Sequence, residues 1–173
     1  KCEEVRYPIH IKRLEHWSGI APNGDLPHVI HLPPKGSLSE DEVFIPAGYI
    51  KAGGDAIAPG GHEVLNTWID SFVMKRTSVT NQEYLLFLND LLEQGREREA
   101  LEYAPQQRNL HKDTRHIIFG RDENNKFCLV PDDEGDMWGL DWPVTKICWH
   151  SAQAYTTWLS EKTEKPWRLP REL

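Results

Sequence analysis

The sequence predicts an α+β domain, and three observations favour that fold class. Apolar residues recur at helical spacing in residues 81–94 and again in residues 151–162, so both segments are expected to be helices. Short apolar runs bounded by glycine, proline and asparagine predict strands around them. The chain has 173 residues, 39% of them hydrophobic and 27% charged, which suffices for one domain with its own core.

The first part of the chain is expected to be separate from the main domain. Residues 1–42 are expected to form a β-rich arm or linker, with short strands at 7–14 and 29–32, the second closed by two prolines. Residues 43–173 are expected to form the main domain. In it, residues 43–50 predict a strand that breaks at Pro46.

Residues 67–75 alternate apolar side chains on both faces, which predicts a strand covered on both sides. The first helix has a clear start, because Thr80 followed by Glu83 has the form of a capping box. Gly95 is placed to end it. The stretch that follows predicts a short helix at 97–103.

The next segments favour a strand–turn–strand unit at 117–119 and 127–130. An acidic loop and a short apolar strand leading to Trp149 precede the second long helix. Pro170 with Glu172 suits the first turn of a further helix. We therefore expect the domain to be incomplete at the C-terminus.

Charge and cysteine content argue against several classes of protein. The formal net charge is −7 and the basic residues are scattered, so neither nucleic acid nor an anionic membrane is the expected partner. No apolar run is long enough to span a bilayer. Three cysteines without a CxxC pair disfavour a disulfide framework or zinc site and favour a reducing, cytoplasmic location.

Two clusters contain residue types that can bind a metal ion. His28 and His31 lie three apart in an extended segment and would point to opposite faces, so solvated histidines are the better interpretation. Asp132, Asp133 and Asp136 supply oxygen ligands around a glycine, as calcium requires, but lack the complete EF-hand loop. A solvated acidic turn is favoured, and the three aspartates remain weak calcium candidates.

The sequence predicts no catalytic residue. Cys148 and His150 lie close in sequence, yet the apolar surroundings would bury the thiol, raise its pKa and make it inert. The sequence therefore predicts a core role for Cys148, and a helix cap in His150.

Seven tryptophans stand out in a chain of this size. Trp149, Tyr155, Trp158 and Trp167 fall on apolar faces and are expected to be buried against the sheet. Trp138 and Trp142 flank Gly139 in a loop and are the predicted ligand- or partner-binding residues.

Five segments occur in a fixed order: Phe44-Ile45-Pro46-Ala47-Gly48, Thr80-Asn81-x-x-Tyr84-x-x-Phe87, Trp142-Pro143-Val144, Trp149-x-x-Ala152-x-Ala154-Tyr155-x-x-Trp158-Leu159 and Trp167-Arg168-Leu169-Pro170-x-Glu172. Over residues 43–173 they resemble the N-terminal half of a formylglycine-generating-enzyme (sulfatase-modifying factor) domain. The resemblance implies an elaborated C-type-lectin-like fold. It also implies that the family's calcium ligands and copper-binding cysteine pair lie in later segments. Cys128 and Cys148 do not match that pair, so no cofactor is expected in this chain, and calcium only in the complete domain.

The arm resembles the segment before such domains in bacterial signalling proteins, where they often follow a serine/threonine kinase. It does so through Arg6-Tyr7-Pro8-Ile9, Glu15-His16-Trp17 and Leu32-Pro33-Pro34. In that context, copies without the paired cysteines act as binding modules. The expected function is therefore a non-catalytic protein- or ligand-binding module, leaning away from an enzyme.

Two alternatives stay open. The chain is also consistent with the N-terminal part of a true formylglycine-generating oxidase or a related iron-dependent sulfoxide synthase. A third interpretation is a proteolytic fragment whose other half is a separate chain. The expected partners are the missing C-terminal half of its own domain and a protein partner.

Overall fold

The computed structural model describes most of the chain in two compact units. The described residues are 1–6, 30–54, 57, 59–61, 63–108, 115–117, 119–132 and 134–171. The predicted strand at 7–14, together with His28, Asp133 and Glu172, lies outside them. One unit comprises Lys1–Thr77 and the other Ser78–Glu172.

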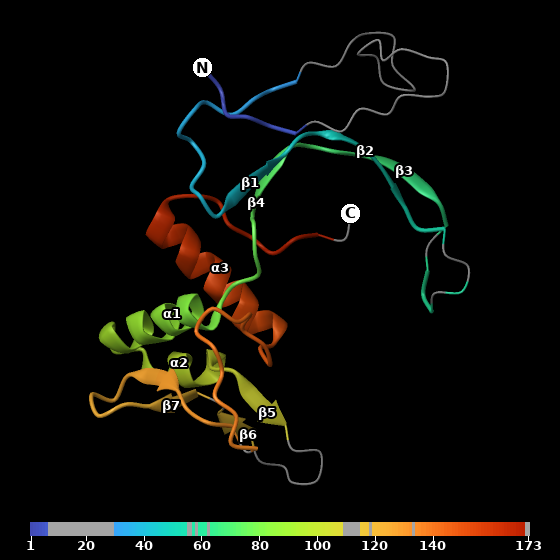
Figure 1. The fold of residues 1–173 in the computed structure, drawn as a ribbon. Helices are drawn as coiled ribbons and strands as arrows, with labels where there is room; N and C mark the ends of the chain where they lie inside the picture. Colours follow the sequence, from blue (N-terminus) through green and yellow to red (C-terminus); the bar gives the residue numbers. More distant parts are fainter. Residues whose placement is uncertain are drawn as a thin grey trace, which may run out of the picture. The chain divides into compact units, whose positions relative to one another are not determined.

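The first unit contains one long antiparallel hairpin (Figure 1). Strand β1 (Glu42–Ile45) pairs with β4 (Phe72–Lys75), and β2 (Gly48–Ala52) pairs with β3 (Leu65–Ile69). The hairpin is interrupted between these two pairs. Pro46, which has no N–H to donate to a ladder, lies in the gap between β1 and β2, as the sequence predicts.

Two strand predictions for this unit are wrong. The single strand expected at 67–75 is two strands, β3 and β4, and the side chains of Phe72, Val73 and Met74 are exposed. The alternation of residues 67–75 shows that apolar side chains lie on both faces of the segment. It does not show whether other parts of the chain cover both faces. Residues 30–32 are not in a strand; beside them only an isolated bridge joins Cys2 to Pro34, because neighbouring prolines cannot donate to a ladder.

The second unit mixes helices with short strand pairs (Figure 1). Its elements are α1 (Asn81–Glu93), α2 (Glu97–Tyr103), β5 (Gln106–Arg108), β6 (Arg115–Ile117), β7 (Phe119–Arg121), β8 (Phe127–Leu129) and α3 (Trp149–Thr163). Strand β5 pairs with β6, and β7 pairs with β8, both antiparallel. The mixture is consistent with the predicted α+β class.

Helix α1 is positioned by the signals expected from the sequence. The Thr80 hydroxyl accepts a hydrogen bond from the Glu83 N–H at 3.3 Å, and the Glu83 carboxylate accepts one from the Thr80 N–H at 2.9 Å. This capping box satisfies two N–H groups that a helix start otherwise leaves free. Gly95, at a φ of 73°, follows the last turn. The prediction of helices at 81–94 and 97–103 is confirmed.

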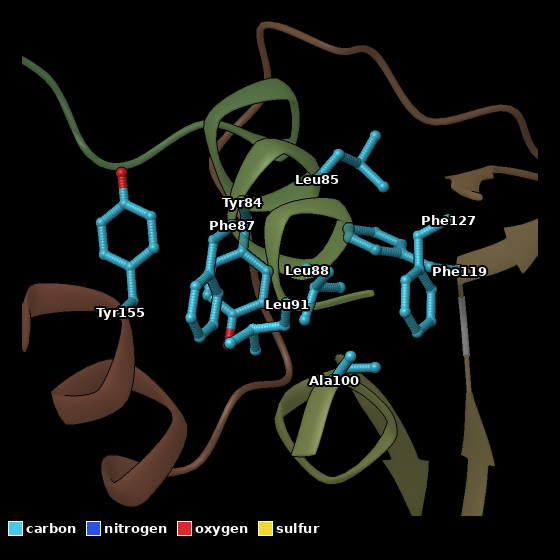
Figure 2. Close-up of a cluster of buried hydrophobic side chains, with 10 residues drawn as sticks. Tyr84, Leu85, Phe87, Leu88, Leu91, Ala100, Phe119, Phe127 and Tyr155 are labelled. Atoms are coloured by element: carbon cyan, nitrogen blue, oxygen red, sulfur yellow. The ribbon is translucent and has the colours of Figure 1, made fainter. Parts of the chain in front are cut away.

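The buried core of this unit is an aromatic and aliphatic cluster around α1 (Figure 2). The Phe87 ring is 1% exposed and lies 5.4 Å from Tyr84, 5.7 Å from Tyr155 and 5.4 Å from Trp158, between ring centroids. Burial raises the pKa of the Tyr84 phenol, whose hydroxyl donates to the Tyr103 carbonyl at 2.8 Å. These contacts join α1 to α2 and α3.

The remaining helices and strands agree in part with those predicted from the sequence. The strand–turn–strand unit is confirmed, with its first strand two residues later than expected. The pair β5–β6 was not predicted. Helix α3 begins at Trp149, two residues before the expected Ser151.

The start of α3 corrects three expectations. The residue at the N-cap is Cys148, so His150 lies inside the first turn and is no cap. The apolar run that leads to Trp149 forms no strand. Trp149 itself is 62% exposed, because it occupies the first helical position and its ring contacts the neighbouring His150 rather than the core. Tyr155 is buried as predicted, while Trp158 and Trp167 are half-buried.

Asp90 fastens α1 to α3. Its carboxylate accepts hydrogen bonds from Lys162 Nζ at 2.8 Å, from Trp158 Nε1 at 2.8 Å and from Gln94 Nε2 at 2.6 Å. The hydrogen bond from the Lys162 ammonium has the largest effect and lowers the pKa of Asp90; burial opposes it, and the Trp158 indole lowers the pKa further.

This pKa shift predicts a pH-dependent contribution to stability. A carboxyl group with a lowered pKa in the folded chain stabilises it above its ordinary value of 3.8, and that stabilisation is lost as the pH falls through the folded value. We expect Asp90→Asn to lower the free energy of unfolding by about 1 kcal/mol at neutral pH, since solvent screens the exposed Lys162.

Urea unfolding of wild type and Asp90→Asn at neutral pH and below about pH 3 tests this. The difference between the two proteins should shrink on acidification. Lys162→Met should reproduce part of the loss, because Trp158 and Gln94 still donate to Asp90. A difference that is the same at both pH values would contradict the assignment.

Candidate binding site

The acidic loop after β8 is organised around one carboxylate. Asp132 Oδ1 accepts hydrogen bonds from the N–H groups of Glu134 and Asp136, both at 3.0 Å, and its Oδ2 accepts one from Trp138 Nε1 at 3.0 Å. The indole bond, followed by the backbone bonds, lowers the pKa of Asp132. Gly135 supports the turn with a φ of 87°. Asp132 therefore fixes Trp138 in place.

This use of Asp132 bears on the calcium prediction. A metal would compete with three donors for its oxygens. No group of three or more His, Cys, Asp and Glu able to hold a metal occurs among the residues that the structure describes, which exclude Asp133. Calcium binding by Asp132, Asp133 and Asp136 stays a prediction.

The segment that follows is anchored to the start of α1. The Asn81 N–H donates to the Trp142 carbonyl and the Gln82 N–H to the Leu140 carbonyl, both at 2.9 Å. The Asn81 side chain also donates, from Nδ2 to the Gly139 carbonyl at 2.9 Å. Helix N–H groups that lack partners inside α1 are thus satisfied by the loop. The loop and the helix start hold each other in one arrangement.

Gly139 allows Trp142 to lie close to this loop. A Cβ at Gly139 would come within 2.7 Å of the Trp142 indole, so only glycine leaves room for the ring. Trp142 remains exposed, and Lys146 Nζ lies 5.1 Å from the centroid of the Trp138 ring. Trp138 is therefore held by specific contacts, whereas the Trp142 ring lies close to Gly139 and remains exposed.

A groove of about 670 Å³ opens between α1, β8 and this loop. Its walls come from three parts of the chain: Gln82, Leu85, Leu86 and Asn89 of α1, Phe127, Cys128 and Leu129 of β8, and Met137, Trp138 and Leu140 of the loop. Three of these side chains are apolar and largely exposed: Leu86 at 60%, Met137 at 59% and Leu140 at 50%. Trp138 is part of the wall, whereas Trp142 is not among the lining residues.

Two hydrogen bonds join the two sides of the groove at its base. Asn89 Oδ1 accepts from the Phe127 N–H at 2.7 Å, and Asn89 Nδ2 donates to the Phe127 carbonyl at 3.0 Å. Leu85 and Phe127 are buried beneath the opening. The helix and the strand are therefore held side by side while the apolar side chains above them stay accessible.

Leu86, Met137 and Leu140 were not among the predicted site residues. One signal was present in the sequence. Residues 84–88 are all apolar, which is more than one helical stripe can bury, so an apolar residue had to face solvent or a partner. The loop residues carried no such signal.

Cys148 differs from its predicted role. The thiol is exposed rather than buried. Its Sγ lies 3.3 Å from the Ser151 hydroxyl, and that hydrogen bond, followed by the Ser151 backbone N–H, lowers the pKa of the thiol. The prediction of an inert core cysteine is wrong, because Cys148 lies at the N-cap position of α3, where its thiol is exposed.

Comparison with known proteins supports the assignment suggested by these motifs. Residues 31–173 match the model of the sulfatase-modifying factor enzyme 1-like domain. The chain belongs to this family. The match covers the Thr80–Phe87 motif that forms the capped core helix and the Trp149–Leu159 motif that forms α3. Searches of curated proteins and of solved structures gave no match. In the part of the sulfatase-modifying factor domain that the structure describes, no helix is long and apolar enough to cross a membrane.

Proposed function

We propose that this sulfatase-modifying factor domain is a non-catalytic protein-binding module. The observation that carries the proposal is the groove between α1, β8 and the 137–140 loop. Binding sites are lined mostly by apolar side chains, and the lining of this shallow, open groove is mostly apolar. Its exposed Leu86, Met137 and Leu140 form the kind of apolar patch that marks interaction surfaces.

The rigidity of the groove also favours binding. Asn89 holds α1 to β8, while Asn81 and Gln82 hold the loop to α1. A site that is already ordered loses less conformational entropy when a partner binds. Binding to this ordered groove therefore costs less conformational entropy than binding to a mobile loop would.

The setting that we propose is a cytoplasmic bacterial signalling protein of the kinase-attached type, with a C-type-lectin-like fold for the complete domain. The arm supports this setting, because it resembles the segment that precedes such domains.

Selection of displayed random peptides on the purified full chain tests the function. We expect peptides to be enriched on the wild type and lost on Leu86→Lys, which places a charge in the apolar wall. Leu101→Lys is the matched control: Leu101 is a partly exposed leucine of α2 that does not line the groove. It should retain the same peptides.

Two results would count against the proposal. Absence of any peptide sensitive to Leu86→Lys would remove the groove as a binding site. If a peptide incubated with the whole chain had a cysteine thiol converted to an aldehyde, the protein would be an enzyme and not a binding module.

A further inference from the structure

We propose that Asp132 is a positioning residue of the groove and controls how tightly a partner binds there. Asp132 does not line the groove, but its carboxylate holds Trp138, which does. This inference rests on the proposed binding function and names a residue on which that function depends. It follows from two observations, the separate uses of the two carboxylate oxygens and the place of Trp138 in the groove wall.

The two oxygens of the Asp132 carboxylate serve different parts of the loop. Oδ1 accepts hydrogen bonds from the N–H groups of Glu134 and Asp136, both at 3.0 Å, and so closes the turn. Backbone bonds close the same turn, because the Asp132 N–H donates to the Asp136 carbonyl and the Gly135 N–H to the Asp132 carbonyl, both at 3.0 Å. Oδ2 instead accepts from the indole N–H of Trp138 at 3.0 Å. The turn therefore has other supports, whereas the bond to Oδ2 acts on the Trp138 ring.

Trp138 has the largest side chain among the residues that line the groove. It is half-buried, so part of its ring stays open to a partner. Lys146 Nζ lies 5.1 Å from the ring centroid, a cation–π contact that also restrains the ring. Because Asp132 already accepts from the indole N–H, the ring needs no hydrogen bond from a partner and offers it an apolar surface.

Loss of the bond between Asp132 and Trp138 would weaken binding in two ways. The indole ring would sample other rotamers, and a partner would have to restrict them on binding. The indole N–H would also lose its acceptor, and a partner that covers the ring would remove this N–H from water without a replacement. We therefore expect a loss of about tenfold in affinity without this bond.

Asp132→Asn is the substitution that separates the ring from the turn. An amide has the shape of the carboxylate but one acceptor oxygen in place of two, so it cannot serve both the backbone N–H groups and the indole N–H. The probe is a set of peptides that are enriched on the wild-type full chain and lost on Leu86→Lys. Asp132→Asn should bind these peptides about tenfold more weakly. Glu134→Gln, the matched control, removes the same charge from an exposed side chain of the same loop and should bind within about twofold of wild type.

Trp138→Phe distinguishes a positioning role from a merely structural one, because phenylalanine keeps a ring but has no N–H. If Asp132 acts through the indole, Asp132→Asn should weaken binding about tenfold in the wild-type background and less than about twofold in the Trp138→Phe background. The NMR signal of the Trp138 indole N–H, assigned by its absence in Trp138→Phe, gives a second readout. This N–H should exchange with solvent faster in Asp132→Asn and at the wild-type rate in Glu134→Gln.

The outcomes separate this inference from the function on which it rests. Equal losses of affinity in the two backgrounds would show that Asp132 only supports the turn, and undiminished binding by Asp132→Asn would show that the ring needs no such support. Either result would overturn the positioning role and leave the binding function standing. Absence of Leu86-dependent peptides would overturn both.

Discussion

Phe87→Ala is expected to lower the free energy of unfolding of the Ser78–Glu172 unit by about 4 kcal/mol. The Phe87 ring is nearly inaccessible and lies between three aromatic rings that come from α1 and α3. Removing it loses the burial of the ring and leaves a cavity, because rings on two different helices cannot close together freely. Urea unfolding followed by tryptophan fluorescence and by circular dichroism measures the loss.

The neighbouring residue provides the control. Leu86→Ala removes an apolar side chain from the same helix turn, but Leu86 is mostly exposed, so its loss should change stability by no more than about 0.5 kcal/mol. Equal effects of the two substitutions would show that the ring cluster is not the core of this unit. The same control would also show that Leu86 can be altered in binding experiments without unfolding the protein.

The parts of the fold predicted from sequence are those with strong local signals. The start of α1 was predicted because Thr80 and Glu83 make their hydrogen bonds within one helical turn, and its end because Gly95 adopts a left-handed conformation. The start of α3 was misplaced because the apolar stripe continues through Trp149 without a Ser, Thr, Asp or Asn to mark the cap.

The groove could not be predicted, because α1 lies about 40 to 60 residues before β8 and the loop, and the contacts that join them leave no local pattern. In the sequence, Asn89 is one polar residue on a helix. In the structure its hydrogen bonds to the Phe127 backbone hold β8 against α1. Trp138 could be proposed because an aromatic residue in an acidic, glycine-containing loop is conspicuous. Leu86, Met137 and Leu140 could not be predicted to line one groove with it, because they come together only in the folded chain.

Asn81→Ala is expected to lower stability by about 2 kcal/mol and to loosen the loop that forms one wall of the groove. Asn81 is fully buried, and its Nδ2 donates to the Gly139 carbonyl. Alanine would leave that carbonyl without the donor and would create a small cavity. Asn81 Oδ1 has no partner among the described residues, so its removal offsets part of the cost and keeps the expected loss below that of Phe87→Ala.

Hydrogen exchange gives a direct measurement, because the backbone N–H groups at positions 81 and 82 donate to loop carbonyls. Both should exchange faster in Asn81→Ala. Gln82→Ala is the matched control, since it removes an exposed side chain while its N–H still bonds to the Leu140 carbonyl. If exchange at the two positions were equally protected in both variants, the Asn81 side chain would not be what holds the loop. The backbone hydrogen bonds from residues 81 and 82 would then be enough to hold the loop that forms this wall, and Asn81→Ala should still bind the peptides.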